Sequence, residues 1–192
     1  MQELIFKIIY MVLYVTAAIG RAPYAIKTKK LKVKVRKRKL VETFILLFTV
    51  PMMILPLFYV FSDWIDYFNI TLPIWVRVMG IIGFSFAVFV HNWTHIALGA
   101  NWSPTLEIKK NQKLITKGPY KYVRHPMYTS TLFWAVFQGL FLSNWLIIIS
   151  GLLCFSAIYF LRVKYEEQLM IEEFGKEYKD YMKRTGRIFP KF

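Results

Sequence analysis

Residues 131–160, TLFWAVFQGLFLSNWLIIISGLLCFSAIYF, carry no charge, and the polar pair Ser143-Asn144 interrupts them near the middle. Each half is short for a membrane crossing, which takes about 20 apolar residues. We therefore predict a tight helical hairpin with spans over 131–143 and 145–161 and a turn at the polar pair. A single long buried helix is the alternative interpretation.

The composition of the whole chain indicates a membrane protein. Hydrophobic residues make up 56% of the 192 residues, and aromatic residues make up 18%. Soluble domains are typically about 45–50% apolar. We predict one all-α, polytopic membrane domain with five transmembrane helices and a cytoplasmic tail over 162–192. Together with the hairpin, the expected spans are 4–19, 43–61 and 73–98.

The distribution of charge predicts the orientation of these spans. Residues 20–40 carry ten Lys or Arg and no acid, whereas 62–72 carries two Asp and no base. Basic loops that alternate with non-basic loops place the N-terminus outside and the C-terminus in the cytoplasm. We interpret the segment 27–39, KTKKLKVKVRKRK, as a topology signal that touches anionic phospholipid. The net charge of +15 therefore does not indicate nucleic-acid binding.

Three other features receive a structural interpretation. The stretch 4–19 follows Glu3 and precedes a basic block, which favours a retained helix over a cleaved signal peptide. The single Cys154 excludes a disulfide within the chain. His91 and His95 have a spacing that can ligate zinc, but 67–106 contains no Asp or Glu, so we predict no metal site.

Two polar clusters flank the predicted hairpin, one at 113–128 and one at 162–167. Because a hairpin returns its ends to the same side of the membrane, we expect both clusters to line one cytoplasmic pocket, built from the 99–130 loop and the C-terminal helical tail. Arg162 and Glu166 share a helix face there, although a simple ion pair would also explain their spacing. His125 has a similar structural alternative. Aromatic walls suit a planar heterocycle or a sulfonium, and the candidates are Tyr120, Tyr122 and Tyr128.

The tail that follows the hairpin is expected to be helical in two pieces. Gly175 favours a stop, and the second piece, 176–185, places Tyr178 and Tyr181 on one face. This piece either lies along the membrane interface or folds back over the 99–130 loop.

A family resemblance adds to these predictions. The segments KGPYKYVRHPMY (117–128), RVKYEEQLMIEEFGKEYKDY (162–181) and GRIFP (186–190) resemble the isoprenylcysteine carboxyl methyltransferase family. The likeness is to the short five-helix prokaryotic branch, and it is strong over the C-terminal half of the chain.

The resemblance implies a cofactor, an acceptor and a set of site residues. The cofactor would be S-adenosylmethionine, bound in the cytoplasmic pocket, and the acceptor would be a prenylated cysteine carboxylate or a similar amphiphile entering from the lipid. The implied catalytic residues are Arg162, which would orient the acceptor carboxylate, with Glu167 and Arg124. The implied cofactor-binding residues are Gln112, Lys113, Leu114, Ile115, Tyr120, His125, Pro126, Met127, Tyr128 and Glu166.

Rival functions are distinguished by charge. A phospholipid N-methyltransferase needs a neutral amine as acceptor and therefore a base, and Arg162 would repel a protonated amine. A membrane reductase that uses a nicotinamide cofactor is a more distant alternative. A channel subunit or scaffold would place charges along a pore, whereas the spans offer mainly Lys7 and Arg77, both near span ends.

Overall fold

The computed structural model describes residues 1–29, 33–36, 39–103, 107–109 and 112–191. The side chains of the predicted topology signal at 28–39, and 104–106 and 110–111 of the predicted pocket loop, lie outside this described part. The elements in chain order are α1 (Gln2–Lys29), β1 (Val33–Arg36), α2 (Lys39–Phe61), α3 (Ile74–Leu98), β2 (Glu107–Lys109), α4 (Pro126–Leu142) and α5 (Trp145–Arg184), with short 3-10 turns at Asp66–Phe68, Gly99–Asn101 and Gly118–Lys121.

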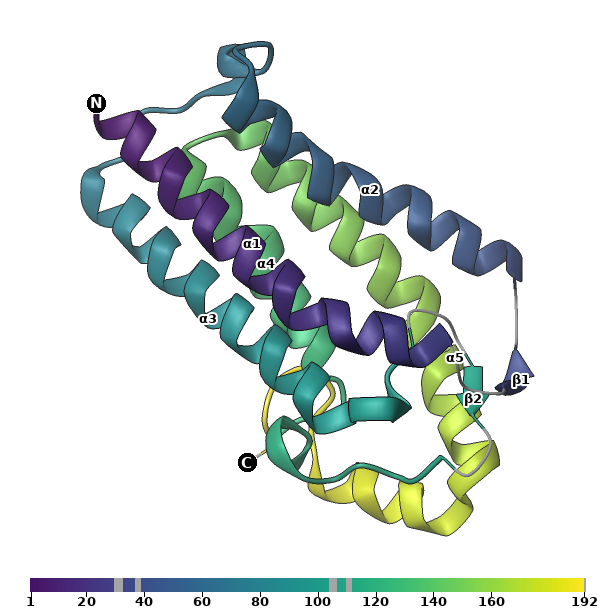
Figure 1. Ribbon diagram of the computed structural model, residues 1–192. Coiled ribbons are helices and arrows are strands. Elements are labelled where there is room, and N and C mark those ends of the chain that lie inside the picture. The colour runs from purple at the N-terminus through teal and green to yellow at the C-terminus, as the bar shows by residue number, and fades with distance from the viewer. Residues whose placement is uncertain (30–32, 37–38, 104–106, 110–111, 192) are drawn as a thin grey trace.

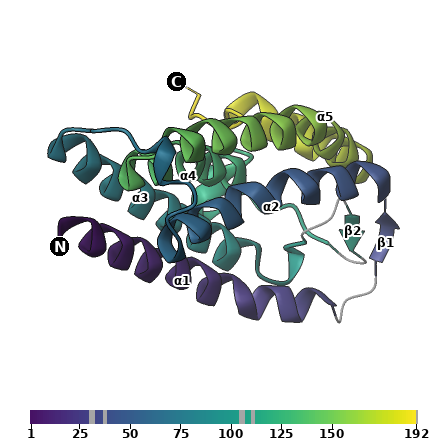
Figure 2. The same ribbon diagram turned by 90° about the horizontal axis from the view of Figure 1, so that it is seen from above.

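The five helices form one bundle with α4 at its centre (Figure 1). α3 and α5 pack on α4, while α1 packs on α3 and α2 packs on α5 (Figures 1 and 2). The N-terminus and the C-terminus lie at opposite ends of the bundle (Figure 1). The predicted all-α membrane fold is confirmed.

One small element departs from the prediction. β1 and β2 form an antiparallel two-stranded sheet that pairs Val35 with Ile108 and Arg36 with Glu107. The alternation of β-branched and charged residues in VKVR and EIK has the two-residue period of a strand. Hydropathy at the length of a membrane span does not detect such short segments.

The predicted hairpin turn is confirmed, and the single long helix is excluded. α4 ends at Leu142, Ser143 adopts the left-handed conformation (φ 55°, ψ 42°), and Asn144 caps the start of α5. The Asn144 side chain accepts a hydrogen bond from the Ile147 amide (3.2 Å). Its Nδ2 also donates to the Ile65 carbonyl and to Asn69 Oδ1, both at 3.0 Å. The turn is therefore fastened to the loop that joins α2 to α3.

A proline in α2 is compensated by the neighbouring helix. Pro56 has no amide hydrogen, so the Met52 carbonyl one turn earlier loses its helical donor. The buried Gln138 of α4 supplies one, because its Nε2 donates to that carbonyl at 3.4 Å. Gln138 Oε1 in turn accepts from the Trp134 indole and from the Tyr10 hydroxyl, at 3.0 and 3.4 Å. One amide thus joins α1, α2 and α4.

The exterior of the bundle is suited to lipid. Three helical segments are long and apolar enough to cross a membrane, namely Gln2–Lys27, Ile74–Asn101 and Trp145–Arg184, and the described part of α2 adds the shorter apolar stretch Thr49–Phe61. Many large apolar side chains of α1, α3 and α5 face outward. The chain is an integral membrane protein, and the helices extend beyond the predicted spans because hydropathy marks only their lipid-facing parts.

Close approach between helices depends on small residues. A Cβ at Gly80 of α3 would lie 2.6 Å from the Phe141 amide nitrogen of α4, and one at Gly151 of α5 would lie 2.7 Å from the Ala135 carbonyl oxygen. Small residues let helix backbones meet in membranes. α4 is therefore held tightly between α3 and α5, which fixes the position of both ends of the hairpin.

α5 breaks at Gly175, where φ is 53° and ψ is −121°. Beyond this break the chain turns back beneath the bundle (Figure 1). Tyr178 and Tyr181 are buried, and the Tyr181 hydroxyl donates to the Tyr120 carbonyl at 2.6 Å. The predicted stop is confirmed, and of the two alternatives for 176–185, folding back over the loop is the one observed.

Candidate active site

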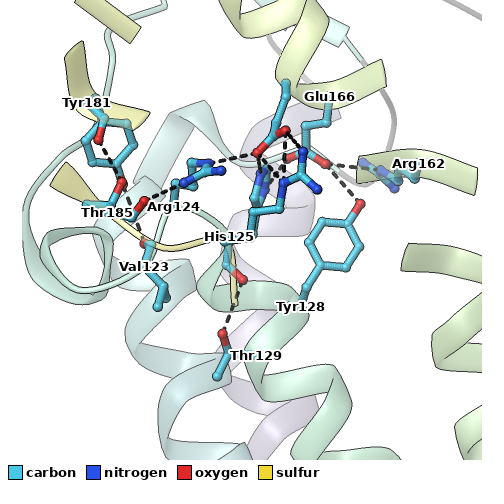
Figure 3. A network of polar contacts seen from close by, with 11 residues as sticks. Val123, Arg124, His125, Tyr128, Thr129, Arg162, Glu166, Tyr181 and Thr185 are labelled. Carbon is cyan, nitrogen blue, oxygen red and sulfur yellow. Dashed lines mark hydrogen bonds and ion pairs between the residues drawn. The ribbon is translucent and has the colours of Figure 1, made fainter. Parts of the chain in front are cut away.

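The hairpin brings the two predicted clusters together at one end of the bundle (Figure 3). His125 Nδ1 lies 3.8 Å from Glu166 Oε1, and His125 Nε2 lies 3.3 Å from Glu167 Oε1. His125 and Glu166 border an open hollow of about 760 Å³, a volume that includes solvent at its mouth. The residues that line it are Leu98, Asn101, Ser103, Gln112, Lys113, Leu114, Ile115, Tyr120, Arg124, His125, Arg162, Glu166, Leu169, Met170, Tyr178 and Tyr181.

Local sequence sets the position of His125. It is the residue before α4 (φ −128°, ψ 60°), and Pro126 at the first helical position restricts it to a non-helical conformation. Its carbonyl still accepts the Tyr128 amide at 3.0 Å. Its own amide donates to the Arg187 carbonyl of the C-terminal segment at 2.9 Å.

Glu166 is the carboxylate that faces the hollow. Its Oε2 accepts a hydrogen bond from the Tyr128 hydroxyl at 3.0 Å and lies 3.5 Å from Arg162 Nε (Figure 3). The Glu166 side chain is one-third exposed, whereas that of Arg162 is largely buried. A carboxylate and a guanidinium therefore stand side by side where α5 meets the pocket.

Glu167 points to the other side of α5 and is 4% exposed. It accepts from Arg124 Nε at 2.7 Å and from Arg187 Nη2 at 2.7 Å, in addition to its contact with His125. Burial alone would raise the pKa of Glu167, but the hydrogen bonds from His125, Arg187 and Arg124 outweigh it and hold the pKa well below its usual range. Glu167 is thus a charged carboxylate enclosed by two arginines and the imidazole of His125.

The aromatic wall is also shielded from water. Burial, followed by the negative charge of Glu166, raises the pKa of the Tyr120 phenol well above its ordinary value. Tyr178 and Tyr181 of the tail also line the hollow. Neutral phenols offer hydrogen-bond donors and flat faces to a ligand.

The structure gathers most of the predicted site residues around the hollow and leaves five outside its walls. The prediction that Tyr122 forms an aromatic wall is wrong, because its side chain is 55% exposed and does not line the hollow. Pro126, Met127 and Tyr128 lie in the first turn of α4, behind His125, and Tyr128 reaches the site through Glu166. Glu167 lies behind His125 as well. The predicted residues in the walls are Gln112, Lys113, Leu114, Ile115, Tyr120, Arg124, His125, Arg162 and Glu166.

Several residues of the site were not predicted. Leu98, Asn101 and Ser103 come from the end of α3 and the turn after it, and Leu169 and Met170 come from the next turns of α5. The helical period from Glu166 could have identified the last two, which lie three and four residues further on. Arg187 had no local signal, because its partner Glu167 is 20 residues away.

His91 and His95 lie inside the bundle rather than in the site. The His95 ring is buried, with its centroid 4.4 Å from that of His91 and 4.9 Å from that of Trp102. His95 Nδ1 lies 2.8 Å from the His91 carbonyl oxygen. This face of α3 packs against aromatic neighbours.

The fold and the site define an all-helical integral membrane protein with a polar, carboxylate-bearing pocket at one end of its bundle. The family model described as the isoprenylcysteine carboxyl methyltransferase (ICMT) family matches residues 78–172. Through this segment, which spans α3, the pocket loop and the hairpin, the chain belongs to that family. The resemblance recognised in the sequence is confirmed.

Curated relatives agree with the family match. The chain is 26% identical over 118 residues to protein-S-isoprenylcysteine O-methyltransferase of Xenopus laevis, covering 60% of this chain and 41% of the relative. It is 31% identical over 114 residues to the enzyme of that name from Dictyostelium discoideum (58% and 48%), and 27% identical over 138 residues to that from Homo sapiens (67% and 49%). The chain thus spans about half the length of these relatives, or less.

A solved structure shares the fold. The structure of the eukaryotic intramembrane Ras methyltransferase ICMT, without a monobody, superposes with a TM-score of 0.53 at 19% sequence identity. The superposition covers 95% of this chain and 63% of the other. All five helices therefore belong to a known membrane architecture.

Proposed function

We propose that this protein transfers a methyl group from S-adenosylmethionine to the carboxylate of a lipophilic acceptor, a prenylated cysteine or a similar amphiphile. The observation that carries the proposal is the placement of Glu166 and Arg162 side by side in a pocket next to lipid-facing helices. The names of the curated relatives support the reaction class.

The residues of the pocket fit the cofactor. Its ammonium and sulfonium groups are cationic, and Glu166 offers the carboxylate that faces the hollow. Tyr120 and Tyr178 offer aromatic faces for the adenine. Residues 112–115 line the hollow outside any helix or strand, so their backbone can approach a ligand closely. When bound, the cofactor supplies an electrophilic methyl group on a sulfur that leaves as a neutral thioether.

Arg162 is proposed to hold the acceptor. A carboxylate is already ionised near neutral pH, so its oxygen can attack the methyl carbon without a general base. The new bond joins the carboxylate oxygen to carbon, the sulfur–carbon bond breaks, and no proton moves. The protein contributes alignment of the reactants and exclusion of water. The guanidinium of Arg162 aligns the acceptor, and the apolar Leu98, Leu169 and Met170 exclude water.

Arg124 and Glu167 stay in the proposed site, with a role in positioning rather than in contact with the acceptor. Arg124 directs Nε to Glu167 and Nη1 to the Thr185 carbonyl. Glu167 is surrounded by its three partners. Both groups are therefore occupied in holding His125 and the pocket wall, and the same holds for Tyr128 behind Glu166.

We also propose that all five helices span the membrane, with the N-terminus outside and the pocket in the cytoplasm. The described parts of the basic segments 20–40 and 99–130 lie at the pocket end of the bundle, whereas 62–72 and the turn at 143–144 lie at the other end (Figure 1). This is the charge distribution that the positive-inside rule expects. A cysteine-accessibility experiment with a membrane-impermeant thiol reagent tests this. Labelling from outside at Asp63→Cys, and none at Lys117→Cys, is the expected result.

The reaction is tested with methyl-labelled cofactor and N-acetyl-S-farnesylcysteine in purified protein reconstituted into vesicles that contain phosphatidylethanolamine. A base-labile product indicates a methyl ester, whereas base-stable label indicates N-methylation and the phospholipid alternative. No binding of S-adenosylhomocysteine by calorimetry would exclude both and favour a scaffold or channel subunit.

The role of Arg162 has its own test. Arg162→Ala should abolish transfer or raise the acceptor KM by at least about tenfold, since a charged hydrogen bond is worth about 1.5–3 kcal/mol. The affinity of the Arg162→Ala variant for S-adenosylhomocysteine should stay within about twofold of the wild-type value. Arg184→Ala removes the same charge from an exposed position of the same helix and serves as the control. Loss of cofactor binding in Arg162→Ala would contradict this assignment.

A further inference from the structure

The C-terminal segment 185–188 runs alongside the residues that precede α4. Val123 and Gly186 form a parallel bridge, and the Arg124 amide donates to the Gly186 carbonyl at 2.9 Å. The His125 amide donates to the Arg187 carbonyl at the same distance. The Thr129 hydroxyl adds a bond to the Ile188 carbonyl at 2.7 Å. The backbone of 123–129 is therefore held by the tail and not only by α4.

Side chains reinforce this contact from both sides. Arg187 Nε lies 3.1 Å from each carboxylate oxygen of Glu167, and Nη2 donates to Oε2 at 2.7 Å. Arg124 joins the same carboxylate and also donates to the Thr185 carbonyl, and Thr185 is itself buried. A buried carboxylate is costly unless it is paired and hydrogen-bonded. Glu167 therefore ties the tail to the helix that carries Glu166.

The imidazole of His125 lies between two carboxylates. Nε2 meets Glu167, and Nδ1 faces Glu166, which borders the hollow. The orientation of the ring depends on Glu167, and the orientation of Glu167 depends on its two arginines. Arg187 acts on the pocket only through these neighbours, since it does not line the hollow in the described part of the chain.

We propose that Arg187 is a positioning residue for the cofactor pocket, and that the segment 185–188 completes the site by fixing His125 and Glu167. This inference rests on the proposed function. It concerns residues beyond the matched family segment, which ends at residue 172.

The test compares Arg187→Ala with a matched control. Lys183→Ala removes one positive charge from an exposed side chain that forms a surface ion pair with Asp180 at 2.8 Å. We expect Arg187→Ala to weaken S-adenosylhomocysteine binding by about tenfold, the equivalent of one charged hydrogen bond. The acceptor KM of Arg187→Ala, measured at saturating cofactor, should stay within about twofold of the wild-type value. Arg187→Lys should recover part of the affinity, because an ammonium keeps one of the two contacts with Glu167.

A second readout does not depend on catalysis. Hydrogen exchange of the peptide covering 120–128 should accelerate in Arg187→Ala, because the Arg124 and His125 amides lose their fixed acceptors. Lys183→Ala should leave this exchange unchanged. If Arg187→Ala cannot be purified, Arg187→Lys carries the test, with a smaller change in the same direction.

The outcomes separate the two proposals. Wild-type protein that fails to bind S-adenosylhomocysteine would refute the proposed function. Wild-type protein that binds it, with Arg187→Ala binding equally well or exchanging at the wild-type rate over 120–128, would refute the positioning role of Arg187. A double-mutant cycle should combine Arg187→Ala with Glu167→Gln. Their effects on S-adenosylhomocysteine affinity should not be additive, because both substitutions act on one carboxylate.

Discussion

Replacing Asn144 with alanine should destabilise the hairpin strongly, because this fully buried residue makes three hydrogen bonds. The cap on the Ile147 amide is worth about 1 kcal/mol. The two bonds from Nδ2, to the Ile65 carbonyl and to Asn69, are worth about 1 kcal/mol each. The sum of about 3 kcal/mol corresponds to a fall of about 6–12 °C in Tm for a chain of this size.

The chain contains a natural reporter for this measurement. Cys154 is its only cysteine and is 4% exposed, so a thiol-reactive fluorogenic dye reports unfolding in detergent. Asn144→Ser keeps a capping oxygen and loses the amide donor, so its Tm should fall by about two-thirds as much. Binding of S-adenosylhomocysteine well below Tm should stay within about twofold, because the turn is about 25 Å from the pocket along α4. An Asn144→Ala Tm within 2 °C of wild type, roughly the effect of 1 kcal/mol or less, would refute the reasoning.

Three further predictions concern the turn and the site. Ser143→Gly should raise Tm, with a gain of about 1 kcal/mol in the same dye assay, because glycine accepts φ 55° without strain and removes a buried hydroxyl that has no hydrogen-bond partner in the described part of the chain. Tyr128→Phe should weaken S-adenosylhomocysteine binding about fivefold in calorimetry, because Glu166 loses a hydrogen bond of about 1 kcal/mol; unchanged affinity would argue against its supporting role. Because the folded-state pKa of Glu167 is depressed, its contribution to stability is complete above about pH 4.3, the unfolded value, and is lost as the pH falls toward the folded value. Thermal unfolding of Glu167→Gln should therefore depend less steeply on pH in this acidic range than that of wild type, and equal slopes would contradict the assignment.

Local patterns were enough to predict the helices and the turn. A run without charges, broken by Ser143-Asn144, predicted a hairpin, since polar groups at that depth need partners that a turn at the far interface can find. The i,i+4 spacing of Arg162 and Glu166 predicted their shared face. Gly175 marked the break in α5, because the chain there adopts a positive φ of 53°, which glycine tolerates better than other residues.

Other features could not be predicted because they join residues distant in sequence. Nothing near Met52 indicates that its carbonyl is met by Gln138, 86 residues later. The pairing of β1 with β2 joins segments separated by two long helices. The i,i+4 spacing placed Glu166 on a shared face with Arg162, but no local pattern indicates that the adjacent Glu167 is enclosed by Arg124 and Arg187.

The sequence by itself therefore determined the membrane class of the protein, its helices, its hairpin and the residue types of its pocket, because hydropathy and helical period are local properties. Only the tertiary structure decided that Glu166 faces the hollow while Glu167 is enclosed by Arg124, His125 and Arg187. The two side chains point about 100° apart on the helix. Which direction meets the pocket, and which meets the returning tail, depends on how the tail packs after Gly175, and that is settled by contacts across the whole fold.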